Sequence, residues 1–354
     1  MRRLLIINYA MDSKDAVFPH QIGIVAELSS TWDRVFVITY TTNSNELSLI
    51  PSNVVIMNLN WHKGPKFIAI LKLFYFFLKA TLTKDQVFLF SYMTETLSAL
   101  IAPLAKLLNI RHILWYAHVS KPLRLSWCHL WVDKLVTSTQ ESCPIHSKKI
   151  ITIGQAVDQT VFSCLDKRVR KNPGKTQLVH VGRIDPSKNI EKIIELFIEK
   201  FQSKGSVLHL IGTNSEKQSH YASSLKSRFK SQVDSGQVIF HGKRDQTFIN
   251  NVLCQSDIFL HAFSGSLDKT LIEAILSKTF VISSNQAFIK EFGCLGKATK
   301  FDNLSAFLSQ ELNIYQQSDV SELQSIVDRR YQHALDNHSR RQWLRKLNQV
   351  LLDA

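Results

Sequence analysis

Two segments in the second half of the sequence combine basic, small and acidic residues in an order suited to binding a phosphate-bearing ligand. The first, LVHVGRIDPSKNIEKIIELF at 178–197, predicts a strand that ends at Gly182, with Arg183 at its carboxyl end. A helix is expected to open around 187–189, with Lys188 in its first turn. Helix-start N–H groups, an arginine fork and an ammonium can together hold a phosphate. The simpler alternative is a surface Arg183–Asp185 pair and a solvated lysine.

The second segment, FLHAFSGSLDKTLIEAILSKTFVISSN at 259–285, predicts a buried strand, a small-residue loop, a helix and another strand. Glu273 falls near the helix start, where its carboxylate could accept hydrogen bonds from ribose hydroxyls. Thr270-x-x-Glu273 also fits a capping box, which satisfies a helix start without any ligand. The spacing leaves both interpretations open.

Several catalytic signatures are absent from the chain. It has no G-x-G-x-x-G, Walker A, G-x-S-x-G or H-E-x-x-H sequence, and no Asp-x-Asp pair of the kind that holds a metal on a nucleotide diphosphate. We therefore expect no metal, and neutralisation of the bound anion by the chain's own groups. Cys143-x-x-His146 has no second Cys/His pair to complete a zinc site. The five cysteines argue against a disulfide framework and for a reducing, cytosolic compartment.

The composition is that of a globular protein with an uneven basic excess. Of 354 residues, 45% are hydrophobic and 20% charged, and the net charge is +14. Residues 51–165 carry twelve Lys and Arg against five acids, whereas residues 1–50 have a net charge of −1. Such an excess suits nucleic acid, an anionic membrane or a polyanionic small molecule. Because the chain has no zinc-finger or RNP signature, we expect no nucleic-acid partner.

The most apolar stretch is GPKFIAILKLFYFFLKAT at 64–81. Lys72 and Lys79 interrupt it, and it is too short to span a bilayer. On a helix the two lysines share one stripe, so the segment fits a helix lying in a membrane interface. The alternative, which the sequence favours slightly, is a core helix of an α/β domain with a solvated lysine stripe.

Short apolar runs alternate with longer amphipathic stretches throughout, which predicts parallel βα units. The expected strands are 4–8, 35–39, 54–59, 87–90, 113–116, 135–138, 178–181, 207–211, 238–240, 258–262 and 280–283. The charged segment 165–176 is the best linker. We expect two doubly wound α/β domains, at 1–165 and 172–335, that face each other across a ligand-binding cleft. A final helix within 336–354 is expected to pack back on the first domain.

The chain resembles retaining glycosyltransferases of the GT-B fold, in family 4. The resemblance rests on HVGRIDPSKNI, on the later small-residue loop with IEAIL, and on the segments 114–139 and 151–162 (ITIGQAVDQTVF). The co-linear order of these segments is more specific than any one of them. It implies two Rossmann-like domains, a nucleotide-sugar donor held mainly by the second domain, and no obligatory metal or other cofactor.

The resemblance also implies roles for individual residues. Arg183 and Lys188 would contact the donor diphosphate, Glu273 the ribose, and His118 the donor sugar. The candidate donor-binding set is completed by the small-residue loop and by glycines at strand ends: Gly182, Gly242, Ser264, Gly265, Ser266, Leu267 and Asp268. The 240–244 turn and Gly212 are expected near the base, without distinguishing uridine from guanosine.

The sequence departs from the family in two places. The family usually has an E-x7-E pair, but Gly265 stands eight residues before Glu273. Asp268 could replace the missing carboxylate or could simply cap the helix. The family's Gly-Gly turn after the first strand is also absent, because the loop reads YAMDSKDAVFPHQ. This loop places Asp12, Asp15 and His20 on the acceptor side, with His20 the candidate for acceptor binding.

These features predict a metal-independent hexosyltransferase that acts on a glycan or lipid-linked acceptor in cell-surface polysaccharide or lipopolysaccharide synthesis. Retention of anomeric configuration is implied by the family resemblance alone. The expected location is the cytoplasm, with peripheral contact on the inner face of an anionic membrane. Two alternatives stay open: a GT-B epimerase or phosphorylase, and a non-catalytic nucleotide-sugar-binding subunit of a polysaccharide assembly complex.

Overall fold

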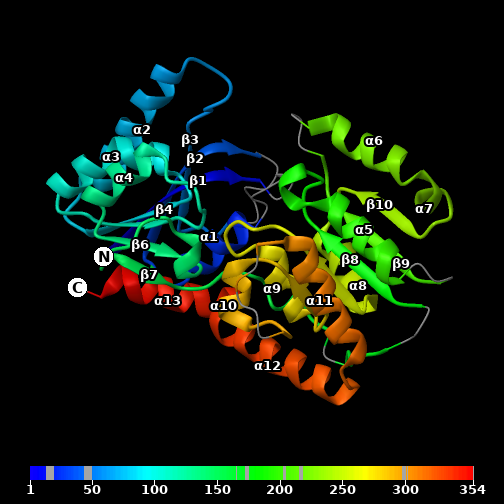
Figure 1. Ribbon diagram of the computed structural model, residues 1–354. Helices are drawn as coiled ribbons and strands as arrows, with labels where there is room; N and C mark the ends of the chain where they lie inside the picture. The colour runs from blue at the N-terminus through cyan, green and yellow to red at the C-terminus, as the bar shows by residue number, and fades with distance from the viewer. Residues whose placement is uncertain are drawn as a thin grey trace. The chain divides into compact units, whose positions relative to one another are not determined.

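The computed structural model describes residues 1–12, 20–43, 50–164, 166–171, 175–201, 205–214, 218–296, 300 and 302–353 (Figure 1). The chain divides into two compact units. Unit 1 comprises Met1–Ile153 and Trp343–Ala354, and unit 2 comprises Gly154–Gln342. Asp15 and parts of the 165–176 linker lie outside the described residues.

Unit 1 contains a seven-stranded parallel sheet in the order β3-β2-β1-β4-β5-β6-β7. Its inner strands are mostly buried aliphatic and aromatic runs, as expected for a parallel sheet covered on both faces, whereas the edge strands are only partly buried. The strands are β1 (Arg2–Met11), β2 (Arg34–Thr42), β3 (Val54–Asn58), β4 (Gln86–Tyr92), β5 (Arg111–Trp115), β6 (Lys134–Thr137) and β7 (Ile150–Thr152).

Helices cover both faces of this sheet. The described helices of unit 1 are α1 (Gln21–Ser29), α2 (Lys66–Thr81), α3 (Glu95–Leu107), α4 (Leu123–Trp131) and α13 (Arg340–Leu352), whose first three residues belong to unit 2. Leu73 and Phe77 of α2 share a core cluster with Leu97 and Ile101 of α3, so these helices lie on one face. The fully buried Trp343 of α13 packs edge-on against Phe90, Tyr92 and Trp115 of the sheet.

Unit 2 contains a five-stranded parallel sheet in the order β10-β9-β8-β11-β12. Its strands are β8 (Gln177–Val181), β9 (Val207–Ile211), β10 (Val238–Gly242), β11 (Ile258–His261) and β12 (Phe280–Ser283). The helices are α5 (Ile190–Phe201), α6 (Ser219–Arg228), α7 (Lys230–Asp234), α8 (Gln246–Gln255), α9 (Lys269–Leu276), α10 (Gln286–Phe292), α11 (Leu304–Gln317) and α12 (Val320–His338).

The start of unit 2 is bonded to the end of α12. Val157 pairs with Ser339, and its N–H donates to the His338 carbonyl at 3.1 Å. Gly154 has a positive φ of 85°, and a Cβ at this position would collide with the Asn337 carbonyl. A glycine is therefore required where these two segments approach each other.

The two-domain α/β fold with parallel sheets agrees with the sequence-based prediction. Every predicted strand forms, and α13 packs on unit 1 as expected. The three-residue strand β7 was missed, because a run of three β-branched residues is too short to show a period.

One cysteine-based expectation is wrong. Cys164 and Cys254 form a disulfide within unit 2, with their Cα atoms 5.8 Å apart. They are 90 residues apart in sequence, so no local spacing could reveal the pair. The cysteine count therefore gives no support to a reducing compartment.

Replacing Trp343 by alanine should destabilise unit 1 by about 3–5 kcal/mol, because it removes the largest fully buried side chain under the sheet. All six tryptophans lie in unit 1, so urea unfolding followed by tryptophan fluorescence reports on this unit alone. Leu352→Ala on the same helix is the matched control, since Leu352 is exposed and its loss should cost little. Equal losses for the two variants would contradict the packing role of Trp343.

Candidate functional site

The two candidate segments follow neighbouring strands of unit 2. Residues 182–189 follow β8 and residues 262–268 follow β11, and these strands pair in parallel. Since the strand order reverses between β8 and β11, the carboxyl ends of this pair form the topological switch point where open α/β sheets bind ligands.

Lys188 lies in a single 3-10 turn, Pro186–Lys188, and not in the first turn of α5 as expected. Asn189 follows in the left-handed conformation, with φ 52°, and separates this turn from α5. The lysine is buried: its ammonium pairs with the Asp268 carboxylate and lies 3.7 Å from the centre of the Phe263 ring. The alternative of a solvated lysine is therefore wrong.

Asp268 precedes α9 at the N-cap position, but its side chain makes no capping hydrogen bond. Its carboxylate instead meets Lys188 and lies 3.5 Å from His261 Nε2. Burial would raise the pKa of Asp268, but the His261 hydrogen bond and the Lys188 charge outweigh burial and lower that pKa well below its usual range. Asp268 is thus an ionised partner of Lys188 and not a helix cap.

Side-chain amides hold the backbone of the 262–268 loop. Asn189 Nδ2 donates to the Ala262 carbonyl at 2.8 Å, and Gln155 Nε2 donates to the Leu267 carbonyl at 2.7 Å. Asn285 Nδ2 lies within hydrogen-bonding distance of three loop carbonyls, those of Phe263, Gly265 and Ser266, at 3.0, 3.0 and 3.1 Å. The sequence reasoning missed all three amides, which are dispersed along the chain.

Gly265 packs directly beneath the Phe263 ring. A Cβ at position 265 would overlap the ring atoms that lie closest to it. The position that carries the first glutamate in the family pattern therefore has no room for any side chain unless Phe263 moves.

Glu273 lies in the second turn of α9 and is buried. Its carboxylate makes no hydrogen bond or ion pair with any residue that the structure describes. Burial raises the pKa of Glu273 to about 7, which the nearby Lys269 charge only partly opposes. The capping-box interpretation is wrong, because α9 begins at Lys269 and Thr270 Oγ1 has no hydrogen-bond partner in the described chain.

The other donor candidates surround this cluster at the ends of strands. Arg183 is exposed and forms no ion pair with a described residue, so the alternative of an Arg183–Asp185 pair is wrong. Gly182 lies over the buried His180 ring, whose Nε2 has no partner in the described chain and would be 3.1 Å from a Cβ at 182. Ser264 and Gly242 are exposed, and Leu267 is buried.

The candidates in unit 1 lie near the carboxyl ends of its strands. His118 is exposed, and its Nδ1 accepts from the Ser120 N–H at 3.0 Å. His20 Nε2 is 3.2 Å from the Tyr92 hydroxyl, at the end of β4. Cys143 is buried and His146 is exposed, which does not suit a shared metal.

Part of the chain matches a known family model. Residues 164–302, which hold the Lys188–Asp268 cluster and Glu273, match the family model for glycosyl transferases group 1. No curated protein matches the chain.

Solved structures of similar shape cover nearly the whole chain. Anabaena Alr3699/HepE in complex with UDP has a TM-score of 0.75 at 12% identity, over 99% of this chain and 100% of that one. A Rickettsia africae glycosyltransferase has a TM-score of 0.74 at 14% identity, over 99% and 98%. The lipopolysaccharide outer core galactosyltransferase WaaB has a TM-score of 0.67 at 12% identity, over 98% of both chains. The chain therefore has the two-domain fold of GT-B glycosyltransferases.

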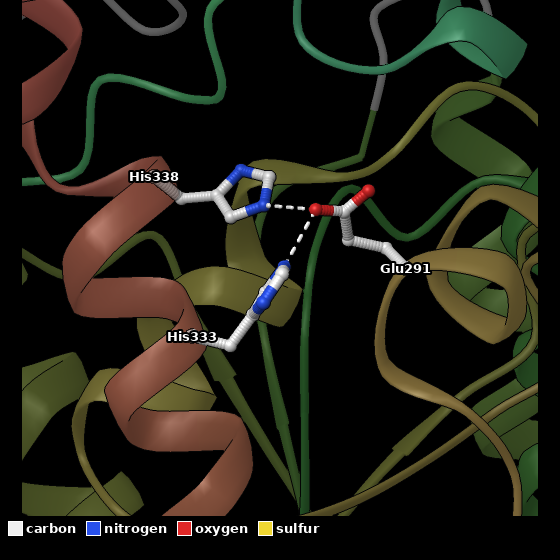
Figure 2. A group of neighbouring side chains, drawn as sticks. All are labelled: Glu291, His333 and His338. Carbon is white, nitrogen blue, oxygen red and sulfur yellow. Dashed lines mark hydrogen bonds and ion pairs between the residues drawn. The ribbon is translucent and has the colours of Figure 1, made fainter.

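A second polar cluster in unit 2 joins α10 to the end of α12. One oxygen of Glu291 lies 2.7 Å from His333 Nε2 and 3.3 Å from His338 Nε2 (Figure 2). His338 Nδ1 accepts from the Gln155 N–H, so the imidazole proton sits on Nε2 and points at Glu291. A metal on Nε2 would move this proton to Nδ1, against the Gln155 N–H. We therefore interpret the cluster as a hydrogen-bonded network that fastens α10 to α12.

The raised pKa of Glu273 predicts how the stability of unit 2 depends on pH. Below the unfolded pKa of 4.5 the group is protonated in both states and has no effect. As pH rises from 4.5 to 7, Glu273 ionises in the unfolded chain but stays protonated in the folded one, so the free energy of unfolding falls. Above pH 7 the group is ionised in both states, and the loss of stability is complete. The rise to about 7 corresponds to roughly 3 kcal/mol as an upper bound.

Glu273→Gln should therefore be more stable than the natural chain at pH 8 and not at pH 4, measured by urea unfolding with circular dichroism. Tryptophan fluorescence, which reports on unit 1, should not change. The exposed Glu199→Gln is the matched control and should show no such pH dependence. If the free energy of unfolding of Glu273→Gln differed from that of the natural chain by the same amount at pH 4 and pH 8, the pKa of Glu273 would not be raised.

Proposed function

We propose that this chain is a glycosyltransferase that moves a sugar from a nucleotide-diphosphate sugar to a glycan or lipid-linked acceptor, with retention of configuration. The observation that carries the proposal is the buried Lys188–Asp268 cluster at the switch point of unit 2, inside the segment that matches glycosyl transferases group 1. Unit 2 is the proposed donor-binding unit. The proposed acceptor side is the part of the predicted segment 1–165 that lies in unit 1, residues 1–153.

The donor diphosphate is proposed to lie at the carboxyl end of β8. There the exposed Arg183 guanidinium and the Lys188 ammonium would face its charge, and the amides of 264–268 would approach sugar and phosphate. Glu273 would accept hydrogen bonds from the ribose hydroxyls, which would give its carboxylate the partners that the described residues do not supply. The proposed base position is the 240–244 turn, with Gly242.

The chemistry follows from the charge that develops when the anomeric bond breaks. The leaving diphosphate gains negative charge, which Arg183, Lys188 and the loop amides would stabilise without rearrangement. We propose that the leaving phosphate assists deprotonation of the acceptor on the same face of the sugar. His118, with Nδ1 engaged by Ser120, would present Nε2 to the donor sugar, and His20 is the proposed acceptor contact.

The cellular role that we propose is synthesis of cell-surface polysaccharide or lipopolysaccharide, in the cytoplasm and in peripheral contact with an anionic membrane. The neighbours in structure support the substrate class, since HepE was solved with UDP and UDP-glucose and WaaB is a lipopolysaccharide galactosyltransferase. No helix among the described residues is both long enough and apolar enough to cross a bilayer.

A donor screen tests the proposal. The protein is incubated with UDP- and GDP-hexoses, with and without membrane extract, and free nucleotide and sugar products are measured. Slow donor hydrolysis with acceptor-dependent release supports transfer. Interconversion of donor sugars would indicate an epimerase, phosphate-dependent cleavage a phosphorylase, and binding without turnover a non-catalytic subunit.

Removing the Lys188 ammonium should lower turnover of the preferred donor about 10²–10³-fold, because it takes away a fixed charge at the leaving group. Lys188→Met keeps the length of the side chain and limits the packing change. Lys192→Met on α5 is the matched control, since Lys192 is exposed and should be dispensable. Circular dichroism verifies that both variants fold; similar turnover in both would refute the assignment of Lys188.

Adding a side chain at position 265 should weaken donor binding without supplying a useful group. Gly265→Ala pushes the Phe263 ring away from Lys188, so the ammonium is no longer held in place for the donor. A cost equal to that cation–π contact, about 0.5–2 kcal/mol, corresponds to a roughly 2–30-fold higher donor Kd. Gly265→Glu should weaken donor binding at least as much.

A double-mutant cycle isolates this cause, with donor Kd measured by calorimetry. In a Phe263→Leu background the Gly265→Ala change should have little further effect, because the obstructing ring is gone. Additive losses in the double variant would mean that Gly265 acts through something other than Phe263.

A further inference from the structure

Helix α2 is apolar on its solvent side as well as on its core side. Leu73 and Phe77 are fully buried against the sheet. Phe67, Leu71 and Tyr75 recur every four residues on the opposite side and are 64%, 65% and 60% exposed. A surface helix normally carries polar residues there, so this row marks an interaction surface.

Helix α4 has the same character. Its Leu125 and Cys128 are buried, whereas Leu123, Trp127 and Leu130 are 90%, 45% and 66% exposed. Trp127 Nε1 donates to the Ala99 carbonyl of α3 at 3.0 Å, which fixes the indole on the outer surface of the two helices.

Both rows belong to one layer of unit 1. Helices α2 and α3 share one core cluster, and α3 and α4 share a second through Ala102, Leu125 and Cys128. The helix between the two rows, α3, adds the partly exposed Leu100. We call the six side chains on α2 and α4 the apolar layer face; both helices are labelled in Figure 1.

The charged residues around this face are mostly basic. Residues 61–149 contain twelve Lys and Arg but only four acids. Three of these acids, Asp85, Glu95 and Asp133, are in ion pairs with basic residues. Exposed Lys66 and Lys79 flank the row on α2, and exposed Lys121 and Arg124 flank the row on α4. A partner for this face must therefore accept apolar side chains and carry negative charge.

We propose that the apolar layer face docks on an anionic lipid bilayer, with its aromatic and aliphatic side chains among the headgroups and the flanking lysines at lipid phosphates. A tryptophan and a tyrosine at the rim of such a face suit the interface, where one part of the ring is apolar and another polar. The inference rests on one part of the proposed function, the peripheral contact with an anionic membrane, and assigns that contact to a surface of unit 1.

Sedimentation of the full chain with vesicles tests the inference. The probes are phosphatidylcholine vesicles alone and the same vesicles with phosphatidylglycerol added. Binding should require the anionic lipid and should fall with salt. Phe67→Ser/Leu71→Ser and Leu123→Ser/Leu130→Ser should each abolish most of the binding. Lys66→Gln/Lys79→Gln should reduce the partition constant roughly fivefold per lysine, from about 1 kcal/mol each.

Matched controls come from unit 2. Val320→Ser on α12 replaces an exposed apolar residue and Lys230→Gln on α7 an exposed lysine, and both variants should leave vesicle binding unchanged. Donor hydrolysis, measured without vesicles, should be the same in all variants, so a failure of the proposed chemistry would be visible separately from a failure to bind lipid.

Three outcomes would overturn the proposal: equal binding to neutral and anionic vesicles, equal loss in the unit 2 controls, or no binding by the natural chain. Analytical ultracentrifugation without lipid tests the alternative that the face binds a second copy of the chain. A dimer that the Phe67→Ser/Leu71→Ser variant loses would assign the face to a second copy of the chain instead.

Discussion

The burial of the Lys188 ammonium is the constraint on which the candidate site depends. A buried charge is stable only if it is paired, and Asp268 supplies the pair while the Phe263 ring lies against the ammonium. That ring occupies the space above position 265, so only glycine fits there. The carboxylate that the family pattern has at 265 is thus absent for a steric reason, and the nearest carboxylate, three residues on, is committed to the lysine.

The loop around this pair is held by groups outside it. Asn285 acts in two directions: Nδ2 lies against the loop carbonyls, and Oδ1 accepts from the Phe288 N–H and caps α10. Helix α10 is in turn fastened at its other end, where buried Arg330 donates to the carbonyls of Phe292 and Gly293 and where Glu291 meets α12. The loop geometry is therefore set before any ligand arrives, which is the condition for efficient electrostatic stabilisation.

The local sequence was sufficient to predict the fold, but it could not predict which side chains pair across long sequence separations. The buried strands are aliphatic runs between polar segments, so they and their parallel arrangement followed from composition and order. Lys188 and Glu273 were found because they stand beside a strand end and a helix start. Their environments were not found, since Lys188 meets Asp268 across 80 residues and Cys164 meets Cys254 across 90. Thr270 was misread because the helix starts one residue before it.

Glu273 stands apart from the other buried carboxylate of unit 2. Glu311 accepts from the N–H groups of Leu295 and Gly296 at 2.7 and 2.6 Å, so the fold satisfies it completely. Glu273 is buried to a similar degree without such donors among the described residues, and its pKa rises accordingly. Buried polar groups in native proteins are nearly always hydrogen-bonded. The burial of Glu273 without such donors supports the proposal that a ligand supplies them, and vicinal hydroxyls are the simplest group that supplies two.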